Sequence, residues 1–169
     1  YDDPVVVAPA VPVGIAEEHR RFAGTLWTSE STFRDYVRDV VGSLASHGWD
    51  RVVVVNGHGG NIAALKEVTA RIVRHDDAYA VPFTWFDEVG EHTSDMGHAG
   101  PLETSMLRHT DPETVHDDRF EAAAADGASG WGEWQGRVNL AVYSDRSAEA
   151  LCDLLDAIRD RESGPRVDG

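Results

Sequence analysis

The sequence is poor in cysteine and lysine, and it has no long apolar run. One cysteine, Cys152, excludes an intrachain disulfide and a thiolate metal cluster within one chain. No apolar segment reaches the roughly 18 residues that a transmembrane helix needs, and no basic, apolar leader opens the chain. We therefore expect no membrane span and no secretion. A cytoplasmic location is the expectation that follows.

Positive charge is also scarce. Thirty Asp and Glu residues outnumber 15 Lys and Arg residues, which gives a formal net charge of -15. Because phosphate binding requires a basic surface, this balance argues against a nucleic-acid or membrane partner. Lys66 is the only lysine, and an acidic, lysine-poor surface is typical of halophilic proteins, whose high-salt cytoplasm screens carboxylate repulsion. An ordinary acidic protein has the same composition, so both origins stay open.

Hydrophobic periodicity predicts alternating strands and helices in the first half of the chain. The β-branched residues 52–55 fit a strand buried on both faces, and residues 5–8 and 79–83 fit two further buried strands. Apolar residues at three- and four-residue spacing predict one helix that begins after an N-cap at Ser29 or Ser31 and ends at Gly48, and another over residues 62–75. This order predicts an α/β fold with a mainly parallel sheet covered by helices.

The second half gives weaker signals. We expect a polar loop over residues 85–99, a short helix over 101–109, a strand over 138–143 and a helix over 148–161. The length of the chain suits one domain, residues 1–161, followed by a flexible tail over 162–169. Because the chain begins with Tyr1 and enters an apolar strand at once, we expect an upstream segment to be missing.

The motif NGHGGN, residues 56–61, places His58 directly after the predicted strand 51–55. Ligands of open α/β sheets bind at the carboxyl ends of the strands, so His58 is a candidate ligand. The glycines resemble a phosphate loop, but the Lys-Ser/Thr pair of a P-loop is absent and the spacing does not fit GxGxxG. A structural histidine is the alternative interpretation.

A second motif, GHAGPLETS over residues 97–105, contains His98 and Glu103. The pKa of a free histidine lies near neutrality, so His98 suits proton transfer, while Glu103 suits metal binding or acid–base catalysis. A carboxylate in the first turn of a helix also stabilises the helix dipole, which is the alternative role of Glu103.

Together, NGHGGN and GHAGPLETS resemble the creatininase family of metal-dependent amidohydrolases. The segments PVGIAEEH (12–19) and FAGT (22–25) extend the resemblance, which covers roughly residues 5–120. The resemblance implies a three-layer α/β/α fold, a homo-hexamer and hydrolysis of non-peptide C–N bonds with one or two divalent metals, zinc, manganese or iron. It implies that His58 is a metal ligand, that His98 passes a proton to the leaving nitrogen, and that Glu103 is a catalytic acidic residue and metal ligand.

Two departures from the family pattern bear on the substrate. Creatininase proper carries a carboxylate two positions after the NGH histidine, where this chain has Gly60. The family's N-terminal segment with Glu, His and Asp metal ligands is absent, so we interpret the chain as a family domain lacking that segment. Candidate substrate-binding residues lie within or near the two motifs: His19, Gly59, Gly60, Asn61, Trp85 and Asp95.

The favoured function is therefore a metal-dependent amidohydrolase acting on a formamide or cyclic amide of a small molecule. Members that lack the second carboxylate resemble deformylases of a formylamino-pyrimidine ribonucleotide. Creatinine hydrolysis is the next alternative, and a peptidase that trims a modified precursor peptide is a third. A catalytically incomplete member with a structural or binding role is the non-enzymatic alternative.

Overall fold

The computed structural model describes residues 4–20, 24–75, 78–88, 101–121 and 152–156. Their contacts group into two compact units, Tyr1–Trp85 with Cys152–Gly169 and Phe86–Leu151. Within the described residues, no helix combines the length and the apolar character that crossing a membrane requires.

The first unit is a strand–helix–strand arrangement preceded by a further helix. Its elements are α1 (Glu30–Ser46), β1 (Arg51–Asn56), α2 (Ile62–His75) and β2 (Tyr79–Thr84). The two strands pair in parallel, from Arg51 opposite Tyr79 to Asn56 opposite Thr84. The two predicted helices, the predicted strands 51–55 and 79–83 and their parallel pairing are confirmed, and the fold class is α/β.

Local sequence signals account for the bounds of α1. The Ser29 side chain accepts a hydrogen bond from the backbone N–H of Thr32, which satisfies one of the unpaired donors of the first turn. After the helix, Gly48 has a φ of 89°, a left-handed conformation that glycine adopts without a steric penalty. Of the two candidate caps, Ser29 and Ser31, the structure uses Ser29, and the predicted stop at Gly48 is confirmed.

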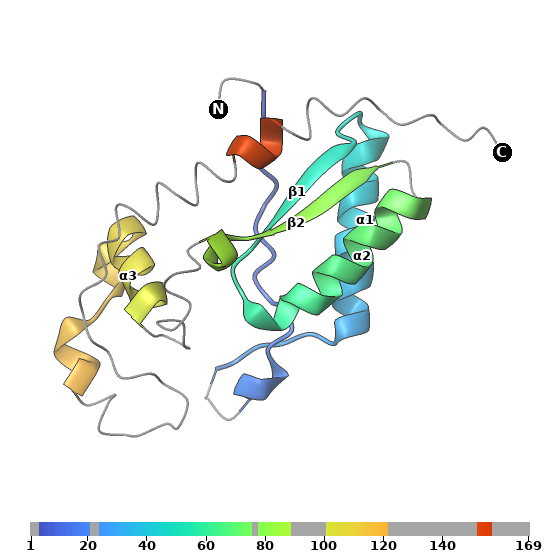
Figure 1. The fold of residues 1–169 in the computed structure, drawn as a ribbon. Coiled ribbons are helices and arrows are strands. Elements are labelled where there is room, and N and C mark those ends of the chain that lie inside the picture. The colour runs from blue at the N-terminus through green and yellow to red at the C-terminus, as the bar shows by residue number, and fades with distance from the viewer. Residues whose placement is uncertain (1–3, 21–23, 76–77, 89–100, 122–151, 157–169) are drawn as a thin grey trace. The chain divides into compact units, whose positions relative to one another are not determined.

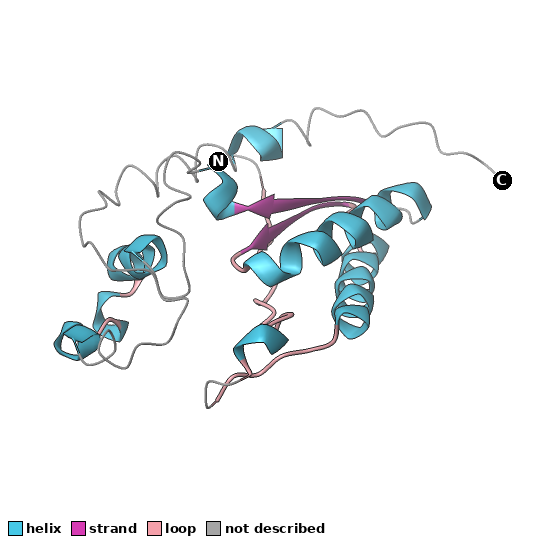
Figure 2. Cartoon of the chain, turned by 60° about the horizontal axis from the view of Figure 1, so that its bottom comes forward, coloured by secondary structure: helices cyan, strands magenta, loops and turns pink. Residues whose placement is uncertain are grey.

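Both helices lie on the same face of the strand pair, as Figure 2 shows. The core between them is formed by one stripe of α1, one face of α2 and the inward side chains of the strands. Its buried residues are Phe33, Val37, Val41, Ala64, Leu65, Val68, Ile72 and Ala80, with Val52 and Val54 packed against them. This core fixes β1, and therefore the turn that follows β1.

Two strand predictions are wrong. Residues 5–8 form no strand in the structure, and the Val7 side chain is 88% exposed. Their apolar pattern indicated burial, but an extended segment becomes a strand only when a neighbouring strand pairs with it. The strand β1 is not buried on both faces either: Val52 and Val54 pack on the core, whereas Val55 is 58% exposed among the described residues.

The second unit contains α3 (Pro101–Thr110), which confirms the predicted short helix. Leu102 and Ser105 are its buried side chains. Arg108 forms an ion pair with Asp117, and its guanidinium carbon lies 5.4 Å from the centroid of the Phe120 ring. In the first unit, residues 152–156 are helical, within the predicted helix 148–161. The predicted strand 138–143 and the tail 162–169 lie outside the described residues.

Candidate metal centre

Asn56, the last residue of β1, holds the turn that carries His58. The buried Asn56 amide donates hydrogen bonds to the His58 carbonyl at 3.0 Å and to Thr84 Oγ1 at 3.2 Å. Its Oδ1 accepts a hydrogen bond from the His58 N–H at 3.2 Å. These three bonds tie the backbone of His58 to the carboxyl ends of both strands, so the sheet sets the position of the His58 backbone.

Gly60 lets a second segment come close to this turn. A Cβ atom on Gly60 would lie 2.3 Å from the backbone oxygen of Ile15 and 2.6 Å from His58 Nε2. Both distances are below van der Waals contact, so any side chain at position 60 would displace one of these groups. Glycine at this position is therefore required by the approach of Ile15, whose oxygen lies 2.8 Å from His58 Nε2.

The short 3₁₀ helix η1 (Glu17–His19) brings two further side chains to His58. Glu18 Oε1 lies 3.2 Å from His58 Nε2 and 3.5 Å from His19 Nε2. The two imidazole rings are tilted by 60° with centroids 5.9 Å apart. Glu18 thus stands between the two histidines. In Figure 1 the blue segment that contains η1 lies beneath the turn that joins β1 to α2.

These three residues fit a divalent metal ion. One ligand atom from each of Glu18, His19 and His58 lies within 4.8 Å of the others, the closeness that a shared ion requires. Two imidazoles and one carboxylate form a His₂Glu set, which suits zinc, manganese or iron and is common in catalytic zinc sites. The side chains are 19% (His19), 27% (His58) and 48% (Glu18) exposed, so the group is partly covered yet reachable.

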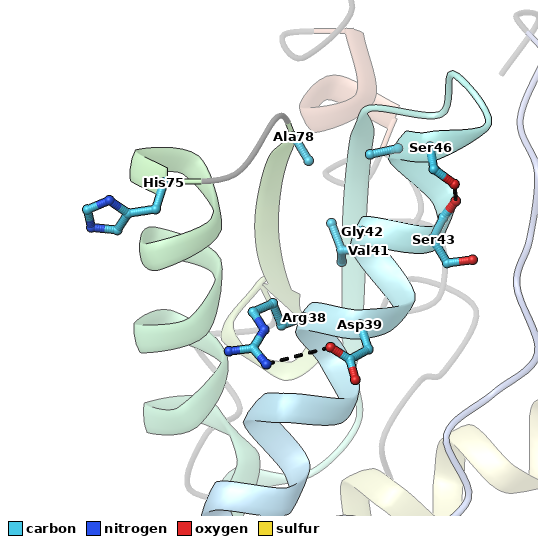
Figure 3. A pocket seen from close by; sticks show the side chains of 9 residues that line it. Arg38, Asp39, Val41, Gly42, Ser43, Ser46, His75 and Ala78 are labelled. Carbon is cyan, nitrogen blue, oxygen red and sulfur yellow. Dashed lines mark hydrogen bonds and ion pairs between the residues drawn. The ribbon is translucent and has the colours of Figure 1, made fainter. Parts of the chain in front are cut away.

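A surface hollow lies at the other end of the strands. It is formed by the carboxyl-terminal parts of α1 and α2, and Arg38, Asp39, Ser43, Ser46 and His75 are among its lining residues (Figure 3). Both helices end where the strands begin, so this hollow faces the amino ends of β1 and β2. Ligands of α/β sheets bind at the carboxyl ends, which favours the His58 group as the functional site.

The comparisons with known proteins agree with the motifs. The family model described as creatininase, creatinine amidohydrolase, matches residues 1–152. The chain belongs to the creatininase family. The suspected family is thereby confirmed.

Curated relatives of this creatininase-family chain carry a more specific name. The chain is 38% identical over 120 residues to a mycofactocin precursor peptide peptidase of Mycobacterium ulcerans (strain Agy99), covering 71% of this chain and 45% of the relative. It is 37% identical over 121 residues to the protein of the same name from Mycolicibacterium smegmatis, covering 70% of this chain and 45% of that protein. The chain thus spans less than half the length of these relatives.

Solved creatininases share the fold. A mutant creatininase of the Zn-Zn type matches with a TM-score of 0.55 and 23% identity, over 82% of this chain and 67% of that chain. A creatininase described as the Mn form matches with a TM-score of 0.52 and 23% identity over the same shares. At this identity the likeness shows the creatininase-like α/β fold.

The predicted site residues of this creatininase-family chain fall into three groups. The structure brings His58 and His19 together, with Gly59, Gly60 and Asn61 in the adjoining turn. Trp85 is half-buried after β2, and Glu103 is half-buried in the first turn of α3, in the second unit. His98 and Asp95 lie outside the described residues. The roles of His98 and Glu103 and the shared metal of His58 and Glu103 stay predictions.

Glu18 and Asn56 were not predicted as site residues. Glu17 and Glu18 received no role in the site from the sequence, because neighbouring carboxylates in an acidic chain are usually solvated. The signal that points to Glu18 is the resemblance of residues 12–19, which end in the pair Glu18-His19, to the family's loop. Only the fold shows that Glu18 is the carboxylate that reaches His58.

Proposed function

We propose that this chain is the metal-binding part of a metal-dependent hydrolase that cleaves an amide C–N bond. The observation that carries the proposal is the meeting of Glu18, His19 and His58 at the carboxyl end of β1. In this proposal the two histidines and the glutamate hold the ion. His19 is therefore a metal ligand here, rather than the substrate-binding residue suggested by its place in a loop.

The ion would activate a water molecule as the nucleophile and would make the amide carbonyl a better electrophile. A bound divalent metal lowers the pKa of its water to about 7 and polarises the carbonyl of the amide. The departing nitrogen is a poor leaving group unless it is protonated, and His98 is the residue we propose for that step. Glu103 remains the proposed second acidic residue of the site.

The names of the relatives guide the order of substrates. The curated relatives are precursor peptide peptidases, so the amide bond of a modified precursor peptide is the first substrate class to test. A formamide, such as that of a formylamino-pyrimidine ribonucleotide, is the second, and small cyclic amides such as creatinine come last. Creatinine ranks last because position 60 has no room for the carboxylate that creatininase carries there.

Metal binding by defined variants tests the proposal. Elemental analysis and a zinc titration would compare the wild-type chain with Glu18→Gln and His58→Ala. The matched control is Glu17→Gln, whose carboxylate pairs with Arg20 instead of the histidines. We expect wild type and Glu17→Gln to bind zinc alike. Loss of a direct ligand should weaken binding by more than the roughly 10- to 100-fold that follows from loss of a residue that only orients a ligand.

Two outcomes would contradict the proposal. Failure of zinc, manganese and iron to bind the wild type would make the chain a catalytically incomplete member. An equal loss of affinity in Glu18→Gln and Glu17→Gln would exclude a specific role for Glu18. If metal binds as expected, turnover of the three substrate classes is measured next, and light scattering tests the proposed homo-hexamer.

A further inference from the structure

Asn61 joins the two segments that meet at the candidate metal centre. Its Oδ1 accepts a hydrogen bond from the backbone N–H of Ile15 at 2.9 Å, across 46 positions of sequence. Its Nδ2 donates to Asn56 Oδ1 at 3.3 Å. The same side chain therefore contacts the loop that leads to Glu18 and the residue that anchors His58.

Ile15 is also bound from the other side of its peptide. The Ile15 carbonyl oxygen lies 2.8 Å from His58 Nε2, and the preceding carbonyl, that of Gly14, accepts a hydrogen bond from the Thr28 N–H at 2.9 Å. The segment Gly14–Ile15 is thus held by two hydrogen bonds, and the Ile15 oxygen also lies against the His58 ring. Because Glu18 follows Ile15 by three residues, the position of the Ile15 backbone limits where the Glu18 carboxylate can reach.

Gly14 shows how tightly Asn61 fits. A Cβ atom on Gly14 would lie 2.8 Å from Asn61 Oδ1 and 3.0 Å from Asn61 Nδ2, so the amide occupies the space that a side chain at position 14 would take. Asn61 Oδ1 already accepts a hydrogen bond from Ile15, and Asn61 Nδ2 already donates one to Asn56. This arrangement suits a residue that sets the distance between two segments better than one that binds substrate.

We infer that Asn61 is a positioning residue, which locks the Gly14–Ile15 segment and thereby brings Glu18 and His19 to His58. The inference rests on the proposed function in one respect, because the effect of Asn61 on metal affinity requires that Glu18, His19 and His58 bind a metal. It predicts that breaking the Asn61 contacts lowers metal affinity although Asn61 touches no metal. Its structural half, the tether of Ile15, holds whether or not a metal binds.

Hydrogen exchange of the Ile15 amide tests the tether directly. In Asn61→Ala the Ile15 N–H loses its acceptor, and its exchange should become about tenfold faster, the factor expected for loss of one hydrogen bond. Asn61→Asp keeps the acceptor for the Ile15 N–H but replaces the donor to Asn56 with a second acceptor, so Ile15 should exchange more slowly than in Asn61→Ala. Thr69→Ala is the control for general destabilisation, since Thr69 is buried in α2 and bonded to Leu65 O.

Metal affinity tests the consequence. Zinc titration of Asn61→Ala should show a Kd about 10- to 100-fold higher than that of the wild type, as for residues that orient metal ligands. Gly14→Ala places a methyl group against the Asn61 amide, so it should also lower the affinity for zinc. Gly42→Ala is its control, because a Cβ at position 42, in α1 and outside the metal centre, meets no atom within 4 Å. The visible spectrum of bound Co²⁺ reports whether the ligand geometry has changed.

The outcomes separate this inference from the proposed function. Faster Ile15 exchange with weaker zinc in Asn61→Ala and Gly14→Ala supports the inference. Unchanged exchange of Ile15, or zinc affinity equal to that of wild type despite faster exchange, overturns it. If wild type binds no metal, the proposed function fails, and exchange of Ile15 alone decides the tether. If Asn61→Ala does not fold, Gly14→Ala decides by the same two measurements.

Discussion

Gly60 shows how one residue controls the contact between two segments. Without a side chain at position 60, the Ile15 carbonyl approaches His58 Nε2 to 2.8 Å. The same glycine stands where creatininase proper carries a carboxylate, and η1 brings Glu18 to within 3.2 Å of the same nitrogen. The chain thus gains a carboxylate at His58 from a different segment, while the turn itself stays small enough for that segment to approach.

Substitution of Gly60 should therefore disturb stability and the metal site together. Gly60→Ala places a methyl group 2.3 Å from the Ile15 oxygen, so we expect the free energy of unfolding to fall by about 1–3 kcal/mol, as for overpacked sites. Gly59→Ala meets no atom within 4 Å and should stay within about 0.5 kcal/mol of wild type. Urea unfolding measures the free energy of unfolding of both variants. Equal stability of the two variants would show that the close approach at Gly60 is absent in solution.

At the scale of elements, the packing of α1 and α2 on the strands holds the site in place. Arg34 of α1 adds an ion pair between the helices, since its Nε lies 2.8 Å from Glu67 Oε2 of α2. A hydrogen bond to Glu30 and the nearby Glu67 charge raise the pKa of Arg34 above its usual value. Exposed pairs contribute little, and the buried apolar face therefore carries most of the stability of this element pair.

Truncation of that apolar face should be costly. Leu65 is 1% exposed, so Leu65→Ala should lower the free energy of unfolding by about 2–5 kcal/mol, through lost burial and the cavity left behind. Val73 lies on the same helix but is 43% exposed, and Val73→Ala should cost less than about 1 kcal/mol. Urea denaturation followed by far-ultraviolet circular dichroism compares the two. A similar loss in both variants would contradict the packing of α2 described above.

At the scale of the whole molecule, the dominant property is the charge of -15. Like charges that are crowded on a folded chain repel one another and destabilise the compact state. Salt shortens the range of this repulsion, from about 10 Å at 0.1 M to about 3 Å at 1 M. The acidic, lysine-poor composition is therefore compatible with a protein that works at high ionic strength.

Salt should accordingly stabilise this chain. Raising KCl from 0.1 M to 2 M should increase Tm by several degrees, measured by circular dichroism. Because KCl also changes water activity, an osmotically matched sucrose solution is the control for effects other than charge screening. A Tm that stays level or falls with KCl, or that rises equally in sucrose, would contradict charge repulsion as the destabilising term.

The sequence by itself determined the helices and strands of the first unit and the place of His58. Three- and four-residue periodicity marked α1 and α2, Ser29 and Gly48 bounded α1, and the end of β1 placed His58 at the ligand-binding edge. These features depend on neighbours within a few residues of one another. The family motifs added the expected metal chemistry.

Only the tertiary structure decided which residues meet His58 and which apolar segments are buried. Residues 5–8 have the pattern of a strand, yet burial depends on partners elsewhere in the chain, and Val7 is largely exposed. Ile15 and Glu18 reach His58 across some forty positions, through the Asn61 tether and the space left by Gly60. Such contacts arise from the folded path of the backbone, and no local pattern of side chains records that path.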